Sequence, residues 1–197
     1  MLKEVHNCLL CQKPLQTQVS WLTFFERFPP IICADCEGKF ELSADTDPDH
    51  RSLYQYNEPM KDFLHRYKFL YDVVLAKVFQ RKLHDLLKNE KRIIVAVPMH
   101  PEKLLERTFS PVEELLNAAK ISYTPLLEKT TTDTQSKKTR EERLNTPQLF
   151  RTAGEVKAAH YVVFDDIYTT GTTIEHAKRA LLEAGAKSVA SVTLIRG

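Results

Sequence analysis

Residues 161–173 read YVVFDDIYTTGTT, and this stretch decides the predicted fold. Its first four residues form an apolar run rich in β-branched side chains, as in a buried strand, and Asp165 and Asp166 are predicted to end that strand. After a turn rich in hydroxyl groups, the apolar spacing of residues 174–184 fits one face of a helix. The order of strand, acidic pair, turn and helix predicts ligand chemistry at the carboxyl end of a strand in an α/β fold.

The turn is suited to a phosphate monoester. Backbone N–H groups at the start of a helix carry partial positive charge, and hydroxyl groups add further donors. The residues concerned are Thr169, Thr170, Gly171, Thr172 and Thr173. The two carboxylates cannot bind a phosphate directly, so we expect them to face hydroxyl groups or a metal, and a sugar phosphate offers a diol. A solvated acidic turn is the alternative, whereas the Walker pattern G-x-x-x-x-G-K-[ST] does not occur in the sequence.

The stretch resembles the phosphoribosyl-pyrophosphate (PRPP) loop of type I phosphoribosyltransferases. By that resemblance, Asp165 and Asp166 are the catalytic pair that holds the ribose hydroxyls, and residues 169–173 bind the 5′-phosphate. It also implies Mg²⁺, which accompanies PRPP, and a parallel sheet. In this family the loop after an earlier strand binds pyrophosphate through backbone amides, a position that falls here on Pro98, Met99 and His100. His100 either contacts that anion or simply lies in the turn.

All four cysteines lie near the amino terminus, as Cys8-x-x-Cys11 and Cys33-x-x-Cys36. Two such pairs resemble a zinc ribbon, in which four thiolates surround one structural Zn²⁺ and leave no open coordination position. Disulfides or free thiols are the alternative. We therefore predict a small zinc-binding segment with a linker in residues 1–50 and a phosphoribosyltransferase-like α/β domain in residues 51–197.

Apolar spacing predicts the remaining elements. We expect further strands at 92–97, 121–127 and 188–195, helices at 59–71, 75–87 and 111–119, and a linker at 41–52. Lys61 and Lys68 share one side of the first helix, where they could face an anionic ligand or only solvent. A patch between the cysteine pairs packs on the main domain or binds a partner, and its members are Trp21, Leu22, Phe24, Phe25, Phe28, Ile31 and Ile32.

Residues 128–150 are polar and basic, which is unusual within a compact domain. We expect a lid over PRPP, in which Lys137 and Arg143 meet phosphate or pyrophosphate. A solvated charged loop is the alternative.

Several motifs together resemble the ComF/ComFC family of competence proteins over nearly the whole chain. They are the cysteine pairs, Tyr56, Lys61, VPMHPEKLLERTF at 97–109, Gln135, Arg143, Asn145, Phe150 and the PRPP-type loop. The resemblance implies a role in late steps of natural transformation, in which single-stranded DNA crosses the inner membrane, and a ComFA-like helicase or ATPase as partner. One segment departs from the family pattern, because Arg-Gly-Phe-Asn-Gln is replaced by RTFSP at 107–111.

The sequence leaves the use of the PRPP site open. One hypothesis is an enzyme that transfers phosphoribosyl from PRPP to an acceptor, which the sequence does not identify. The others are a module that binds a partner or single-stranded DNA, with PRPP as a regulator or the site as a vestige, and a PRPP sensor that regulates transcription. A formal net charge of +2 neither demands nor excludes nucleic acid. The sequence has no apolar stretch long enough for a membrane helix, so we expect a cytoplasmic protein that is not integral to the membrane and that partners could recruit to its inner face.

Overall fold

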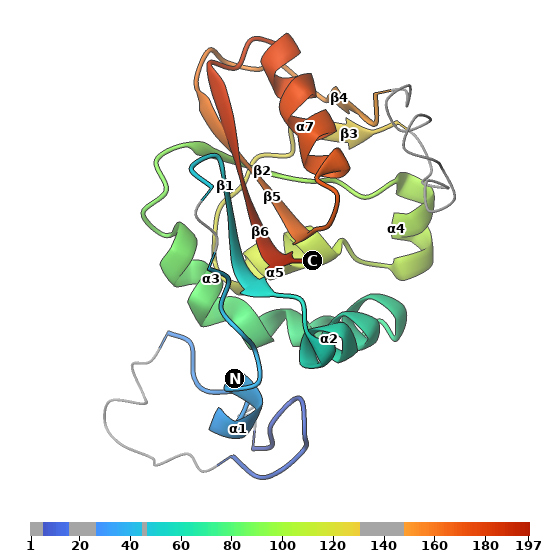
Figure 1. Cartoon of the computed structure of the whole chain (residues 1–197). Helices are drawn as coiled ribbons and strands as arrows, with labels where there is room; N and C mark the ends of the chain where they lie inside the picture. Colours follow the sequence, from blue (N-terminus) through green and yellow to red (C-terminus); the bar gives the residue numbers. More distant parts are fainter. Residues whose placement is uncertain (1–5, 16–26, 45–46, 131–147) are drawn as a thin grey trace.

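The computed structural model describes residues 6–15, 27–44, 47–130 and 148–197. Its centre is a four-stranded sheet in the order β1-β6-β5-β2, and all its neighbouring strands pair in parallel (Figure 1). The strands are β1 (His50–Gln55), β2 (Ile93–Ala96), β5 (His160–Tyr168) and β6 (Ser188–Arg196). Parallel pairing gathers the carboxyl ends of these strands at one edge, which is the predicted place for the ligand.

Helices cover both faces of the sheet. Helix α7 (Thr172–Glu183) packs on one face, while the other face is covered by α2 (Glu58–Phe69), η2 (Val73–Phe79), α3 (Gln80–Leu87) and α5 (Pro111–Ala118). Figure 1 shows α2 below the carboxyl ends of β1 and β6. Along β5, Tyr161 and Val163 pack toward α7, while Val162 and Phe164 join the core on the α2 side. This alternation follows from the pleat of a strand, and it ends at Ile167 and Tyr168, which pack on the α2 side and the α7 side respectively.

Most predicted elements are confirmed. The strands at 92–97 and 188–195 are β2 and β6, and the helices at 59–71 and 111–119 are α2 and α5. The predicted helix at 75–87 is instead a 3₁₀ helix, η2, that continues into α3. Helix α7 ends as Gly185 predicts: that glycine has φ 107°, and the N–H groups of Gly185 and Ala186 bond back to the carbonyls of Leu182 and Leu181.

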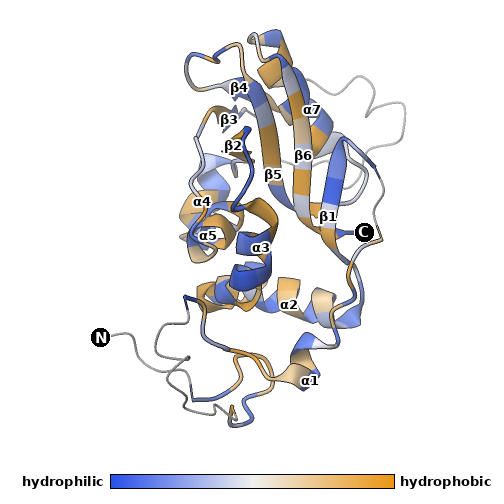
Figure 2. Cartoon of the chain, turned by 90° about the vertical axis from the view of Figure 1, so that its left-hand side faces the viewer, coloured by the Kyte–Doolittle hydropathy of each residue, from blue (hydrophilic) through white to orange (hydrophobic). Residues whose placement is uncertain are grey.

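Two predictions about strands are wrong. Residues 121–127 are not a strand of the sheet, because only Thr124 bridges to β2 and the N–H of Leu126, which would continue the ladder, donates instead to the carbonyl of Thr124. The chain instead forms β3 (Leu127–Lys129), which pairs in an antiparallel manner with β4 (Phe150–Thr152). The predicted linker at 41–52 is also wrong at its end, since β1 begins at His50. Figure 2 shows why: β1 is mostly hydrophilic, whereas β5 and β6 are apolar along much of their length.

The amino-terminal segment lies against α2 and α3 (Figure 1). It contains the single-turn helix α1 (Ala34–Glu37). The predicted packing of its apolar patch is confirmed where the structure describes it, because Phe28 and Ile31 are buried and Ile32 packs on the main core. The other members of that patch, at 21–25, lie outside the described residues. In the part of the chain that the structure describes, no helix combines the length and apolar character needed to cross a membrane.

The segment that departs from the family pattern contains a strained residue. Helix α4 (Pro101–Arg107) ends at Thr108, which has φ 69°, in the left-handed region, and its N–H donates to the carbonyl of Leu104. Glycine adopts this conformation at little cost, whereas a Cβ makes it unfavourable by about 1–2 kcal/mol. Threonine therefore occupies a position whose backbone favours the glycine of the family pattern.

We predict that Thr108→Gly raises the free energy of unfolding by about 0.5–1 kcal/mol, because relief of the left-handed strain exceeds the entropy that glycine adds to the unfolded chain. Urea denaturation would measure the change. Thr108→Ala is the matched control, since it removes the same side chain but keeps a Cβ and should give no such gain. Equal stabilisation by both variants would show that the backbone conformation is not the cause.

Candidate functional site

The acidic pair lies inside β5 near its carboxyl end. Asp165 and Asp166 do not end the strand as predicted, because β5 continues to Tyr168 through pairing with β6, in which Asp165 lies opposite Thr193. Both side chains are buried. Since residues alternate along the strand, Asp165 points toward the α7 side of the sheet and Asp166 toward the α2 side.

Asp166 forms an ion pair with Lys68. The Lys68 Nζ lies 2.7 Å from the Asp166 Oδ2, and the two side chains are 18% and 9% exposed. Of the two lysines singled out in the sequence, Lys61 is the solvated one, because it is exposed and pairs with Glu58 of its own helix. The buried row of α2 runs through Leu64, and Lys68 follows Leu64 by one turn. Lys61 lies seven residues earlier and therefore on the same side of α2, so spacing in the sequence does not distinguish the two lysines, and the packing of α2 decides which one meets Asp166.

The folded protein disfavours the ionised form of Asp165. Burial raises its pKa to about 7 and the neighbouring Asp166 carboxylate adds to the rise, while Lys68, the Asp166 N–H and Lys129 oppose it. The opposing hydrogen bond runs from the Asp166 N–H to the Asp165 Oδ1 over 2.8 Å. A second carboxylate this close disfavours ionisation of Asp165, in the same direction as its burial.

Helix α7 begins at the predicted hydroxyl-rich turn. Gly171 is its N-cap, with φ 77°, and a Cβ on this residue would lie 2.5 Å from the hydroxyl oxygen of Tyr168. Glycine is therefore required both for the backbone conformation and for space. Thr169 and Thr170 are exposed, and the hydroxyl groups of Thr170 and Thr172 lie 3.0 Å apart. Thr173 follows in the first turn of the helix and is partly exposed.

The side chain of Tyr168 packs against the turn at Gly171. Its ring packs on His50 with centroids 4.2 Å apart, and the guanidinium of Arg196 lies over it at 5.2 Å. His50 is buried and contacts the hydroxyl groups of Ser191 and Ser52, each at 2.9 Å. The sequence does not predict the contact between His50 and Tyr168, because His50 lies in β1, whose first residues were predicted to belong to the linker at 41–52.

The turn after β2 adjoins the acidic pair. The Val97 N–H donates to the carbonyl of Phe164, so Pro98, Met99 and His100 leave the sheet beside Asp165. The three residues are partly exposed. For His100 the structure shows a role in the turn: its Nδ1 accepts a hydrogen bond from the Glu102 N–H and caps α4.

The predicted lid residues Lys137 and Arg143 lie outside the described residues. The ends of the polar stretch are described, and the pairing of β3 with β4 holds Lys129 opposite Phe150. Beside β4, Gln148 donates through Nε2 to the carbonyl of His176 in α7. The two ends of this stretch are thus anchored on the α7 side of the sheet, the side to which Asp165 points.

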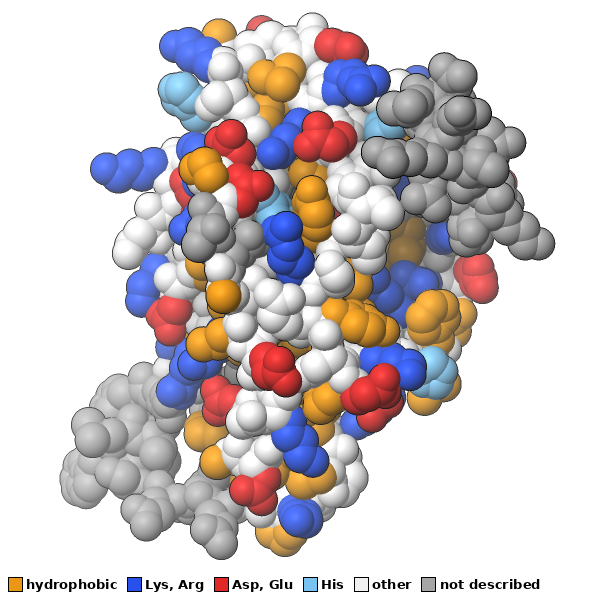
Figure 3. All heavy atoms as spheres, in the orientation of Figure 1, with side chains coloured by type: hydrophobic (Ala, Val, Ile, Leu, Met, Phe, Trp, Pro, Cys, Tyr) orange, Lys and Arg blue, Asp and Glu red, His pale blue; other side chains and the backbone are white. Residues whose placement is uncertain are grey.

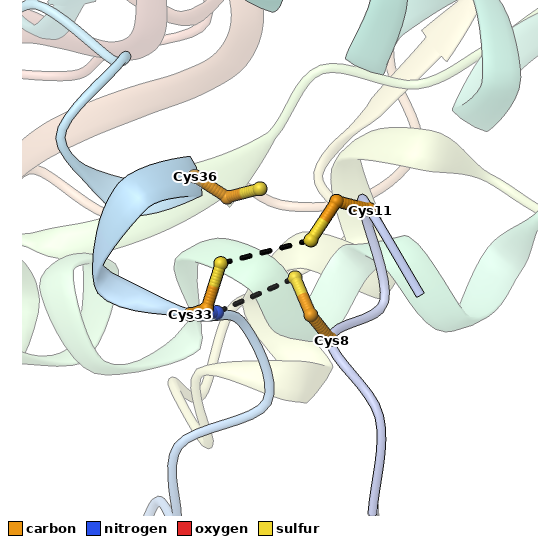
Figure 4. Close-up of side chains that lie close together, drawn as sticks. All are labelled: Cys8, Cys11, Cys33 and Cys36. Carbon is orange, nitrogen blue, oxygen red and sulfur yellow. Dashed lines mark hydrogen bonds between the residues drawn. The ribbon is translucent and has the colours of Figure 1, made fainter. Parts of the chain in front are cut away.

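The four cysteines converge as predicted (Figure 4). The potential ligand atoms of Cys8, Cys11, Cys33 and Cys36 all lie within 4.8 Å of one another, and no disulfide joins them. The sulfurs of Cys11 and Cys33 are 3.7 Å apart, close to the edge of about 3.8 Å of a tetrahedron with Zn–S bonds of about 2.3 Å. The donor set and its spacing therefore fit a metal ion.

Backbone N–H groups around the cluster favour the thiolate form of Cys8. Burial by itself raises the pKa of Cys8, but hydrogen bonds from neighbouring backbone N–H groups outweigh it and lower the pKa to about 6. One of these bonds is from the Cys33 N–H at 3.3 Å. Burial and the surrounding thiols raise the pKa of Cys36 to about 12. The cluster thus contains one readily ionised thiol, and a bound cation would ionise the others.

The parallel sheet, the buried carboxylates and the glycine-initiated helix define a protein with a phosphoribosyltransferase-type domain. The sequence profile of the phosphoribosyl transferase domain matches residues 74–197. The chain belongs to the ComFC family of competence proteins. Competence protein ComFC of Streptococcus pneumoniae is 35% identical over 96% of this chain and 100% of its own length, and ComFC of Bacillus subtilis is 32% identical over 97% of this chain and 78% of its own.

A more distant relative is the DNA utilization protein YhgH of Salmonella typhimurium, which is 26% identical over 92% of this chain and 86% of its own length. Among solved structures, purine phosphoribosyltransferase from Pyrococcus horikoshii matches at 14% identity with a TM-score of 0.40, covering 65% of this chain and 84% of that chain. Glutamine PRPP amidotransferase from B. subtilis matches at 19% identity with a TM-score of 0.43, over 66% of this chain and 30% of that chain.

We predict that Asp165→Asn stabilises the protein in a pH-dependent way. The pKa of Asp165 is higher in the folded chain than the value near 4 of an unfolded chain, so its stabilising contribution is present at low pH and is lost as the pH rises from about 4 to about 7. The variant should therefore exceed the wild type by about 1–4 kcal/mol at pH 8 and differ little at pH 4.

Urea denaturation at both pH values would measure this difference. Asp62→Asn, at an exposed position of α2, is the matched control and should show no gain at either pH. An advantage of Asp165→Asn that is equally large at pH 4 would contradict the electrostatic explanation.

Proposed function

We propose that the site binds PRPP with Mg²⁺ and supports transfer of its phosphoribosyl group to an acceptor. The observation that carries the proposal is the buried pair Asp165 and Asp166 at the carboxyl end of β5, directly before a turn that opens α7 at Gly171. A diol and a phosphate on one ligand match these two features in their order along the chain. The phosphoribosyl transferase domain and the ComFC relationship are consistent with this ligand.

In this proposal each part of the site binds a different group of PRPP. The ionised carboxylates accept hydrogen bonds from the ribose hydroxyls, which orients the sugar. The turn at 169–173 donates backbone N–H and hydroxyl groups to the 5′-phosphate. The turn at 98–100 lies beside the pair and would receive the pyrophosphate that leaves C1′. Lys137 and Arg143 of the polar stretch remain proposed contacts of these phosphates.

Mg²⁺ would enter with PRPP. Asp166 is already paired with Lys68 and Asp165 with a backbone N–H, so the ligand's own phosphate oxygens are the better donors for the cation. Bound there, Mg²⁺ neutralises the charge of the pyrophosphate. The acceptor of the phosphoribosyl group is not defined by the described residues.

We further propose that the protein acts in natural transformation, at a late step of DNA uptake, because the named relatives are competence proteins. A ComFA-like ATPase and single-stranded DNA are the proposed partners. The alternative is a binding module in which PRPP is regulatory or the site is vestigial. On the face shown in Figure 3, basic and acidic side chains are interspersed, which gives that alternative no particular support.

We also propose that residues 1–50 form a zinc unit with a linker and that residues 51–197 form the phosphoribosyltransferase domain. The clustering of Cys8, Cys11, Cys33 and Cys36 supports Zn²⁺ as a structural ion, because a short segment gains from it the folding energy that a small core cannot supply.

Calorimetric titration with PRPP tests the main proposal. We expect binding that requires Mg²⁺, is lost in the double variant Asp165→Asn/Asp166→Asn and weakens as the pH falls below about 7, because a protonated carboxyl accepts hydrogen bonds less well. Asp62→Asn/Asp85→Asn, at two exposed positions, is the control for general loss of negative charge. Wild-type protein that is folded and metal-loaded yet binds no PRPP would reject the function.

The same double variant separates enzyme from binding module in cells. If catalysis or PRPP binding is needed, transformation should fall together with PRPP binding while the protein remains folded. Transformation that persists without a working site would support the non-catalytic alternative.

For the metal, we predict that Cys8→Ser releases bound zinc and destabilises the amino-terminal segment, while PRPP affinity changes by less than about threefold, or about 0.7 kcal/mol. Metal content by atomic emission and PRPP calorimetry would be compared with the wild type. A large loss of PRPP affinity would show that the two units are energetically coupled.

A further inference from the structure

We propose that Lys68 is a positioning residue of the sugar site, which holds the Asp166 carboxylate ionised and oriented so that one of its oxygens receives a ribose hydroxyl. The inference rests on the proposed PRPP site and adds to it a residue from α2, outside the motif that predicts the site. Its basis is the geometry of one ion pair and the charges around it.

The ion pair is well suited to fix a rotamer. Its 2.7 Å length and low exposure mean that the ammonium group and the carboxylate are held with little competition from water. Lys68 lies in the last turn of α2, where the negative end of the helix dipole favours a cation. Its stem follows the buried row of the helix. Lys68 is therefore placed by the packing of α2 and not by a flexible loop.

The pair also leaves room for a ligand. The Lys68 Nζ contacts the Oδ2 atom of the Asp166 carboxylate. A carboxylate offers about four acceptor sites on its two oxygens, so an ion pair on one oxygen does not prevent a hydroxyl from donating to the other. Lys68 can thus remain in place while the sugar binds.

The surrounding charges show why this cation is needed. Asp166 is next to Asp165 on its own strand, and its charge raises the pKa of Asp165. Tyr67 of α2 is also near, since burial and the charge of Asp166 raise its pKa. Arg107 of α4 acts on Tyr67, and Lys129 of β3 acts on Asp165. Lys68 is the cation in contact with Asp166 itself. Without it, two buried neighbouring carboxylates would share a proton over a wider pH range.

Lys68→Met tests the positioning role. An opposite charge at this distance lowers the pKa of a carboxyl by about 1–3 pH units, so its removal should shift the pH midpoint of PRPP binding upward by about that amount. At pH 7 the affinity for PRPP with Mg²⁺ should fall roughly tenfold or more, and it should approach that of the wild type near pH 9. Lys68→Arg, which keeps the charge, should retain most of the wild-type pH profile.

Lys61→Met is the matched control, because it removes an exposed lysine from the same helix and should leave both affinity and midpoint unchanged. A loss in Lys68→Met that is equal at every pH would indicate damage to packing and would overturn the positioning role. If the wild type binds no PRPP, the proposed function itself fails, and the effect of Lys68 on the carboxylates must be measured without a ligand.

A ligand-independent measurement distinguishes these failures. Titration of protein labelled with ¹³C at the aspartate carboxyls, assigned with Asp165→Asn and Asp166→Asn, reports the midpoints of the pair directly. The upper midpoint should rise in Lys68→Met and not in Lys61→Met. An unchanged midpoint would overturn the proposal even if PRPP binds, whereas a raised midpoint in protein that binds no PRPP would locate the failure in the proposed ligand.

Discussion

The burial of two adjacent carboxylates at the end of β5 is the electrostatic constraint on which the site depends. Asp165 and Asp166 lie on opposite sides of one strand, yet they remain close enough for each to disfavour the other's charge. The fold compensates chiefly with Lys68 of α2, which pairs with Asp166 and also favours the charge of Asp165, while Lys129 of β3 has a smaller effect on Asp165. Keeping buried carboxylates ionised lowers the free energy of unfolding. Such a loss is typical of a site that must present ionised groups to a ligand.

Helix α2 connects the two halves of the molecule. Arg66 donates from its guanidinium to the carbonyls of Leu9 and Leu10 in the first cysteine pair, at 3.0 and 3.2 Å, and also pairs with Asp72. Two residues later Lys68 contacts the Asp166 carboxylate. The same helical turn therefore contacts the cysteine-rich segment on one side and the carboxyl edge of the sheet on the other.

The parts of the fold that sequence predicted well are those with a strong local signal. The run from β5 through Gly171 into α7 combines an apolar strand, a left-handed glycine and a helical apolar face, all within one continuous stretch. The convergence of the cysteines followed from their spacing. The failures have a different character. β1 is a hydrophilic edge strand with few apolar residues to signal it. The run at 121–127 has the composition of a strand, but the Leu126 N–H turns back to the carbonyl of Thr124 and the ladder with β2 ends there.

The sequence was therefore sufficient to predict the α/β class, the acidic pair, the hydroxyl-rich turn and the four-cysteine cluster, because each depends on residues that are neighbours in the chain or on a known ligand spacing. Which lysine meets the acidic pair, and which side chains support the turn, depend on the tertiary structure. Lys68 meets Asp166, and His50 meets Tyr168, only because α2 and β1 pack against the ends of strands formed much later in the chain. Contacts between such distant residues leave no local pattern, since their geometry is set by packing and not by spacing.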